Sequence, residues 1–258
     1  MYLSIVVPFY NRSNTIQRCL QSIGKHADVE IIVVDDFSHI EYTDQGYNEK
    51  IIRLPFNQGP VAARIVGAEN SSGNWILFLD SDDELMENWR SIVNCQINDS
   101  EYSVHGYTSI GEMTQQDFAI NDQVGYWRWV GDLNRSADYI LFVKRDLILG
   151  LDLPKLRMSE VWMINKLFNS GKGVYHKTPI FIYHQDSGNQ LSKRQKIPIF
   201  LGKFERESIS FVASEFVSLY ASFPNGFKKA WAKRLIKETA LSLNIFALAR
   251  IVFRVLKK

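Results

Sequence analysis

The stretch WILFLDSDDEL, residues 75–85, places an apolar run typical of a buried β-strand directly before three carboxylates, those of Asp80, Asp82 and Asp83. Several carboxylates at one strand end repel one another, and a bound cation relieves that repulsion. Mg²⁺ and Mn²⁺ take oxygen ligands of this kind, usually one or two carboxylates plus substrate phosphates. The Asp-x-Asp turn therefore indicates half of a metal site. The alternative is a solvated acidic turn that caps a following helix, ELMENWRSIV (84–93).

Three further runs of β-branched residues precede this strand, and helical patterns lie among them. The predicted strands are LSIVVPF (3–9), EIIVVDD (30–36), KIIRLP (50–55) and WILFLD (75–80). A helix capped by Asn14 is expected after the first strand, and another that begins near Pro60 is expected after the third. This alternation predicts an α/β fold with a doubly wound, mostly parallel sheet of Rossmann-like type.

In such sheets, ligands bind beyond the carboxyl ends of the strands. Two acidic pairs lie there, Asp35 with Asp36 and Asp80 with Asp82. Each pair alone is compatible with a turn or a helix cap. Together they make a site for a nucleotide and a metal ion the favoured interpretation.

The pattern loosens after residue 100. Strands are expected within ADYILFVKR (137–145) and GVYHKTPIFIYHQD (173–186), and a helix over 157–170 is expected to end at Gly171. From about residue 197 the sequence favours helices.

Composition points to an ordered protein with one sizeable core, because 46% of its 258 residues are hydrophobic and 13% are aromatic. The two cysteines, Cys19 and Cys95, lie in helical patterns, so two small buried thiols are favoured over a disulfide. The N-terminal apolar run lacks a basic region and stops at Pro8, and no stretch reaches the roughly 18 apolar residues of a transmembrane helix. A cytoplasmic protein is expected, with any membrane contact at the surface.

Four strings carry a resemblance to a known family: SIVVPFYNR, then IIVVDDFS, then NQG followed by Arg64, then FLDSDD. In this order and at these separations they resemble glycosyltransferase family 2, a family of inverting enzymes with the GT-A fold. The resemblance is strong over residues 1–90 and looser over 138–190. It implies a GT-A catalytic domain (1–195), made of a nucleotide-binding half (1–100) and an acceptor-binding half (101–195), and a helical, basic C-terminal region (196–258).

The resemblance also implies a donor site, residue by residue. The nucleotide-sugar-binding positions are Pro8, Tyr10, Arg12, Asp36, Arg64 and Asp80, and the metal-binding positions are Asp82 and His184. In this assignment Asp36 contacts the uracil edge of a UDP-sugar, Asp80 contacts the ribose or sugar, and Asp82 binds the Mn²⁺ or Mg²⁺ that bridges the diphosphate. A divalent ion and the arginine at position 64 would stabilise the charge of the departing diphosphate. His184 can complete a metal's coordination, and the alternative is a structural histidine at a strand end.

The sequence departs from the family pattern at two places. A glycine is common after the second Asp of VVDD, and Phe37 stands there. Family members often show Glu-Asp where SEVWMINKLFNSG has Ser159 and Glu160. Glu160 is therefore the expected catalytic base, which takes the proton from the acceptor hydroxyl in a direct displacement. The alternative is a structural charge in the first turn of a helix.

The loosely patterned middle of the chain is expected to select the sugar. Its aromatic string GYWRWVGD places Trp127 and Trp129 on one face of a strand, either as a stacking platform for a pyranose or as part of a core. Weaker candidates for the base are Glu101, Asp132 and Asp138. The Q-x-x-R-W string of processive synthases is absent, so transfer of one sugar per encounter is expected.

A basic C-terminal tail, residues 227–258, carries nine Lys or Arg residues and one acid, Glu238. Its apolar residues recur at roughly helical spacing, so it can lie in an anionic membrane interface and bring the protein to a lipid-linked acceptor. The alternative is a helix packed on the catalytic domain or on another subunit. Nucleic acid is not an expected partner, because the rest of the sequence has no basic run of similar density.

The sequence and its resemblance thus predict a metal-dependent, inverting glycosyltransferase. It would move glucose, galactose or an N-acetylhexosamine from a UDP-sugar to a hydroxyl of a glycan acceptor. The expected setting is bacterial O-antigen or capsule synthesis, with a lipid-linked acceptor at the inner face of the cytoplasmic membrane. Two rival interpretations stay open: a metal-dependent phosphoryl or nucleotidyl transferase, and a non-catalytic nucleotide-sugar-binding subunit that has lost its base.

Overall fold

The computed structural model of the chain describes residues 2–97, 100–110, 118–120, 139–151, 163–164, 167–168 and 170–184. The chain divides into two compact units, Met1–Arg157 with Ile164–Gly188 and Met158–Met163 with Asn189–Lys258. Apart from Met163, the described residues belong to the first unit. The predicted C-terminal region 196–258, with its basic tail, and the pair Trp127 and Trp129 lie outside the described residues.

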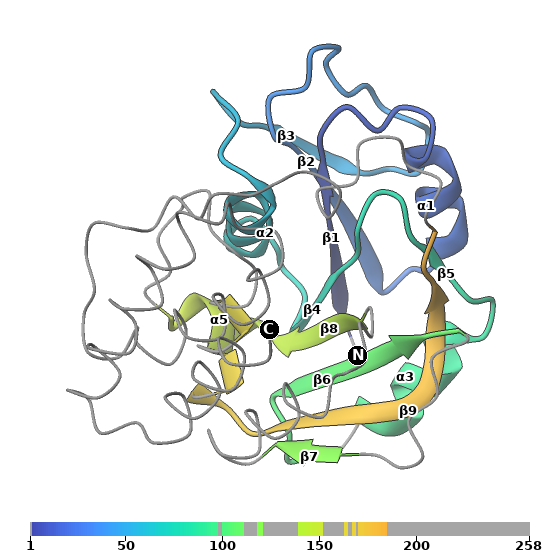
Figure 1. The fold of residues 1–258 in the computed structure, drawn as a ribbon, viewed down its shortest axis with the longest axis vertical. Helices are drawn as coiled ribbons and strands as arrows, with labels where there is room; N and C mark the ends of the chain where they lie inside the picture. Colours follow the sequence, from blue (N-terminus) through green and yellow to red (C-terminus); the bar gives the residue numbers. More distant parts are fainter. Residues whose placement is uncertain are drawn as a thin grey trace, which may run out of the picture. The chain divides into compact units, whose positions relative to one another are not determined.

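Four parallel strands form the first half of the sheet, in the order β3-β2-β1-β4 (Figure 1). Their bounds are β1 Leu3–Phe9, β2 Val29–Asp35, β3 Lys50–Arg53 and β4 Trp75–Phe78. Helix α1 (Ile16–Ile23) connects β1 to β2, and α2 (Pro60–Glu69) connects β3 to β4. The nearly continuous burial of β1 and β4 is that of strands covered on both faces. The predicted doubly wound half and its four strands are confirmed.

Beyond β4 the sheet becomes mixed, in the order β4-β8-β6-β9-β5, with β7 paired to β9. The bounds are β5 Glu84–Leu85, β6 Val104–Ser109, β7 Phe118–Ile120, β8 Tyr139–Lys144 and β9 Gly173–Ile182. Strand β8 runs antiparallel to β4 and β6, so β6 is parallel to β4. Figure 1 shows β9 curving from β6 and β7 towards β5. This curl brings the end of β9 beside the residues that follow β4.

The helix predicted over 84–93 is a correction with a functional consequence. Glu84 and Leu85 form β5 against β9, and the helix, α3 (Trp89–Ile97), begins only after it. The hydrogen bonds of the β5–β9 ladder therefore override the local helical pattern. The acidic turn does not lie at the N-terminus of α3, so the alternative of an acidic helix cap is wrong.

Another local prediction is also wrong. The N-cap of α1 is Thr15 rather than Asn14, because the carbonyl of Arg12 accepts the N–H of Thr15 at 3.0 Å and closes a turn there. The strand predicted within ADYILFVKR is confirmed as β8, and α5 (Arg145–Leu149) follows it.

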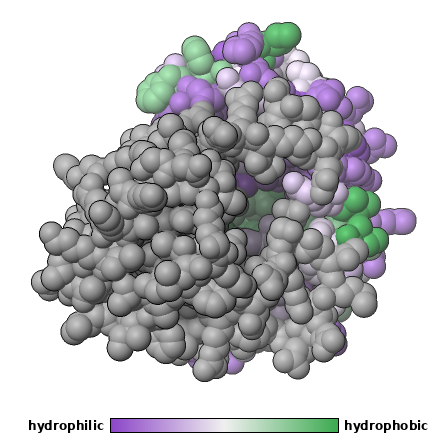
Figure 2. Space-filling model, in the orientation of Figure 1, coloured by the Kyte–Doolittle hydropathy of each residue, from purple (hydrophilic) through white to green (hydrophobic). Residues whose placement is uncertain are grey.

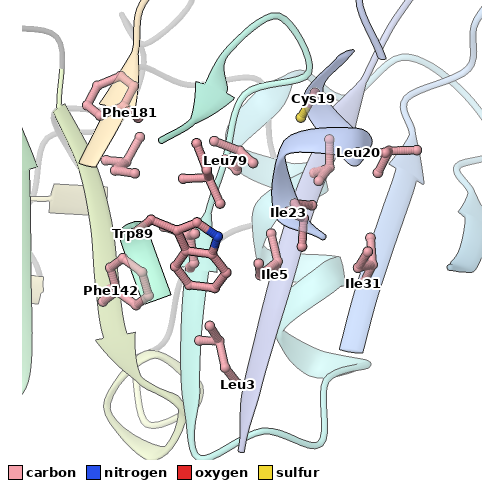
Figure 3. Close-up of a cluster of buried hydrophobic side chains, with 14 of the residues drawn as sticks. Leu3, Ile5, Cys19, Leu20, Ile23, Ile31, Leu79, Trp89, Phe142 and Phe181 are labelled. Atoms are coloured by element: carbon pink, nitrogen blue, oxygen red, sulfur yellow. The ribbon is translucent and has the colours of Figure 1, made fainter. Parts of the chain in front are cut away.

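A hydrophobic cluster packs α1 and α3 against the sheet (Figure 3). Ile16, Cys19, Leu20 and Ile23 form the buried face of α1, as their spacing predicts. Both cysteines are free thiols, but Cys95 is exposed, so its predicted burial is wrong. Position 95 lies on α3 outside the buried set of that helix.

The helix predicted over 157–170 is described only at residues 163–164, 167–168 and 170. These residues are helical, and Gly171 donates its N–H to the Leu167 carbonyl at 2.9 Å, where the predicted end lies. No helix in the described part of the chain is long and apolar enough to cross a membrane.

Candidate functional site

Asp35, the last residue of β2, organises the loop that follows the strand. Its side chain is fully buried, and it accepts the N–H groups of Ser38 at 2.8 Å and Tyr42 at 3.2 Å. The same carboxylate forms an ion pair with Arg53 at the end of β3. These contacts fix the loop after β2 to the edge of the sheet.

The second acidic residue, Asp36, was predicted to contact the nucleobase. It is 3% exposed, and its two carboxylate oxygens accept the N–H groups of Gln58 at 2.6 Å and Gly59 at 2.8 Å. Asn57 adds a side-chain bond to the Asp36 carbonyl at 3.0 Å. Asp36 thus holds the NQG turn against the end of β2. Each carboxylate oxygen has two acceptor sites, so a contact with a nucleobase would add to these bonds.

The acidic turn after β4 is surrounded by arginines from other elements. Arg64 of α2 pairs with the carboxylate of Asp80, and Arg12 pairs with that of Asp82 at 2.8 Å. Arg18 of α1 donates to the Asp82 carbonyl at 3.0 Å. The structure therefore brings together four predicted residues of the donor site. Asp80 remains the most accessible of them, with a side chain that is 49% exposed.

Below the turn, the buried thiol of Cys19 donates to the Asp80 carbonyl at 3.4 Å. Burial raises the pKa of Cys19 well above its usual value, and the charges of Asp83, Asp80 and Asp82 raise it further. The thiol is therefore neutral at physiological pH and acts as a packed donor under the turn.

The predicted metal ligand His184 reaches the same region from β9. Its Nε2 lies 2.9 Å from Oε2 of Glu84, the first residue of β5. Glu84 pairs in register with Ile182, so Asp82 and His184 each lie two residues beyond that pair, at the same end of it. The curl of β9 thus carries His184 to the acidic turn.

A metal at this turn would have a mixed donor set. Within the described ranges, no three His, Cys, Asp or Glu side chains are gathered closely enough to enclose a metal ion. A carboxylate and substrate phosphates are the oxygen ligands that suit Mn²⁺ or Mg²⁺, whereas an imidazole is a softer ligand than Mg²⁺ prefers. The residues present therefore fit an ion that binds together with a diphosphate, and not one enclosed by protein ligands alone.

The remaining predicted nucleotide residues lie at the end of β1. Pro8 is half-buried within that strand, and Tyr10, which follows the strand, is 37% exposed. Across from them, Phe37 has a φ of 62°, in the left-handed region that favours glycine. This backbone conformation gives a physical reason for the glycine that is common at that position.

Two residues at the site were missed from the sequence, Arg18 and Glu84. Arg18 lies in the first turn of α1, where the positive end of the helix dipole disfavours a cation unless acceptors are near. A cation in the first turn of a predicted helix could therefore have indicated Arg18 as a site residue. No sequence pattern could have indicated Glu84, because β5 is too short to show a periodic pattern.

The expected base, Glu160, and its neighbour Ser159 lie outside the described residues, as do Asp132 and Asp138. Glu101 is described, and it pairs with Lys172 at 2.9 Å on the surface. It precedes β6, which runs parallel to β4, so it lies at the opposite edge of the sheet from the acidic turn. Glu101 is therefore not a candidate for the base.

Comparison with known proteins agrees with this arrangement. Residues 4–118 match the family model "Glycosyl transferase family 2". An uncharacterized glycosyltransferase of Haemophilus influenzae is 42% identical over 89 residues, which make up 33% of this chain and 30% of that relative. The glycosyltransferase GlyG of Streptococcus pneumoniae is 24% identical over 221 residues, 72% of each chain. The chain spans less than a third of the length of several curated relatives that it matches.

The fold has a counterpart among solved structures. A crystal structure of S. aureus TarS 1-349 in complex with UDP-GlcNAc superposes with a TM-score of 0.60 at 20% identity, and the match covers 93% of this chain and 72% of that one. The parallel half, the mixed half and the curled β9 together make the GT-A fold of that protein. Residues 4–118 therefore match glycosyltransferase family 2 in sequence, and the described part of the chain has the GT-A fold.

Proposed function

We propose that this chain transfers a sugar from a UDP-sugar to a hydroxyl group of a glycan, with inversion at the anomeric carbon. One observation carries the proposal: within a family 2 domain, Arg12, Arg18 and Arg64 converge on the turn that holds Asp80 and Asp82. Three arginines thus surround a pair of carboxylates. A bound diphosphate can pair with the arginines, and a bound divalent ion can pair with the carboxylates. This arrangement supports a donor site at the carboxyl end of β4.

The divalent ion, Mn²⁺ or Mg²⁺, would be held by Asp82 and His184 and would supply positive charge to the departing diphosphate. Arg12 and Arg64 would add charge of the same sign from the protein itself. Asp80, the most exposed of the site's carboxylates, would accept a hydrogen bond from a ribose or sugar hydroxyl.

In the transfer step, the acceptor oxygen forms a bond to the anomeric carbon while the bond from that carbon to the phosphate oxygen breaks. UDP leaves with the electron pair, and the acceptor proton passes to a carboxylate. We assign that carboxylate to Glu160, on the family resemblance. In-line attack from the face opposite the leaving group inverts the anomeric centre.

The proposed sugar is an N-acetylhexosamine, glucose or galactose. TarS, which shares the fold, was crystallised with UDP-GlcNAc, so this donor is the first to test. The proposed acceptor is a lipid-linked glycan of bacterial surface polysaccharide synthesis. The basic tail 227–258 would then hold the protein at the inner face of the cytoplasmic membrane.

The test is a thermal-shift and transfer panel with UDP-, GDP-, CMP- and dTDP-sugars, each with and without Mn²⁺. We expect UDP compounds with Mn²⁺ to raise the Tm of the wild type, and Asp82→Asn to abolish the rise. Glu101→Gln is the matched control, since it removes an exposed carboxylate at the opposite edge and should behave as the wild type.

Release of phosphate or transfer of a nucleotide instead of a sugar would favour a phosphoryl or nucleotidyl transferase. Binding without any turnover would favour the non-catalytic subunit. A folded protein that no nucleotide sugar stabilises would overturn the donor site.

A further inference from the structure

Two loops at the carboxyl edge of the sheet are joined into one unit that presents aromatic side chains. The N–H of Asn11, after β1, donates to Ser38 Oγ at 3.0 Å, and the N–H of His39 donates back to Asn11 Oδ1 at 2.9 Å. The rings of Tyr10 and His39 lie edge to face, with centroids 6.3 Å apart. The loop after β1 and the loop after β2 are therefore fixed relative to each other.

Both Asn11 and Phe37 of this unit have a positive φ, which asparagine tolerates better than phenylalanine does. The φ of 62° at Phe37 is costly for a bulky side chain, yet the ring is not buried: the residue is 46% exposed. Core packing therefore does not explain why phenylalanine occupies this position. A residue kept in a strained conformation with an exposed ring indicates a functional role.

The ring is also supported from one side. The guanidinium of Arg53 lies 5.2 Å from the centroid of Phe37, and it is anchored by the buried carboxylate of Asp35 and by the Ser38 carbonyl at 3.0 Å. An anchored cation against an aromatic ring holds that ring in place. The rest of the Phe37 ring stays exposed. Phe37 directly follows Asp36, the residue assigned to the nucleobase.

We propose that Phe37 is a stacking surface for the nucleobase of the donor, and that it sets how tightly the base is held. The proposal rests on the proposed function, because it assumes that a nucleoside diphosphate binds at this edge. Every base offers a flat face, so the ring supplies affinity by stacking and leaves base identity to hydrogen bonds. The backbone strain at position 37 is then the cost of placing a ring where glycine would relax the loop.

The experiment measures binding of two probes to the full chain by calorimetry: UDP with Mn²⁺, and inorganic pyrophosphate with Mn²⁺. Pyrophosphate lacks a base, so stacking cannot affect it. We expect Phe37→Gly to weaken UDP binding about 10-fold, within the range known for base stacking, and to leave pyrophosphate binding within about twofold. The Tm should rise by roughly 2 °C, because glycine adopts a positive φ without strain.

Further variants keep the test interpretable. Phe37→Leu should weaken UDP binding as glycine does, and Phe37→Tyr should bind as the wild type, since it keeps a ring. Phe56→Ala removes another exposed ring that has no positive φ and should change neither probe.

Unchanged UDP binding in Phe37→Gly would overturn the stacking role, and so would an equal loss of UDP and pyrophosphate binding. If the wild type binds pyrophosphate but not UDP, the base site is wrong. If it binds neither, the proposed donor site fails and the stacking role fails with it.

Discussion

The two acidic pairs of this chain look alike in sequence and differ in the structure. Asp35 and Asp36 are buried, and they hold loops together through backbone N–H groups and Arg53. Asp80 and Asp82 instead face arginines from three other elements, and Asp80 remains half exposed. The difference teaches that acidic pairs at two strand ends of one sheet can have different roles: the first pair fixes the loops of the rim, whereas Asp80 of the second pair stays accessible.

The largest predicted effect concerns Asp35 and the stability of the fold. Asp35→Asn removes the charge partner of Arg53 and replaces one of the two oxygens that accept buried backbone N–H groups, so we expect a loss of about 3 kcal/mol in the free energy of unfolding. Urea denaturation measures it. Asp28→Asn is the control, because the Asp28 side chain that pairs with Arg90 is 47% exposed and should contribute less than about 1 kcal/mol. Equal losses in both variants would contradict the scaffold role of Asp35.

The second prediction concerns the other pair. Asp82→Asn should lower kcat/KM about 100-fold or more, equivalent to about 2.7 kcal/mol, while the free energy of unfolding falls by less than it does in Asp35→Asn. The small stability change is expected because the lost pair with Arg12 is offset by weaker repulsion from Asp80 and Asp83. Steady-state kinetics and urea denaturation on the same variant separate the two. A large loss of stability with normal turnover would reverse the proposed division.

Much of the rim could be predicted from the sequence, for a definite reason. The buried strands are unbroken apolar runs, so the positions of Asp35, Asp36, Asp80 and Asp82 at strand ends follow from where those runs stop. The order of strands in a doubly wound sheet then places both pairs at one edge. Their different roles could not be predicted, because they depend on which N–H groups and arginines the loops bring near.

Features that depend on pairing between distant segments could not be predicted from the sequence. β5 has two residues, and only β9, about a hundred residues later, makes it a strand and brings His184 to Glu84. No local pattern contains that information. The fit of Phe37 was likewise uncertain from sequence, since a positive φ is a property of the folded loop. Glu160 lies outside the described residues, so its assignment remains a prediction.

The stability of the fold should also fall at acid pH because of a buried histidine, independently of the two acidic pairs. Burial, and to a lesser extent His176 at 2.9 Å, lower the pKa of His105 to about 3. The unfolded chain binds this proton near pH 6.5 and the folded chain does not, so stability falls as the pH drops from about 6.5 towards 3. At pH 5 the expected loss is about 2 kcal/mol relative to pH 7.

The check is urea denaturation at pH 7 and pH 5 in the wild type and in His105→Phe. Whatever the stability of the variant at pH 7, its loss between the two pH values should be smaller by about 2 kcal/mol. An unchanged loss would assign the acid sensitivity to other groups, and the carboxylate pairs would then be the first to examine.

The smallest predicted effect tests how α2 positions Arg64 for the second pair. Gly67 lies where α2 meets β1, and an added Cβ would lie 2.2 Å from Val6 Cγ1. Gly67→Ala therefore forces the helix away from the sheet at a cost of about 2 kcal/mol, partly offset by about 1 kcal/mol of better helix propensity. We expect a net loss of about 1 kcal/mol and weaker UDP binding, because Arg64 moves with the helix. Adding Val6→Ala makes room for the new methyl group, so the double variant should be more stable than the sum of the single losses predicts. Additive losses would mean that the close contact of α2 with β1 does not set the position of Arg64.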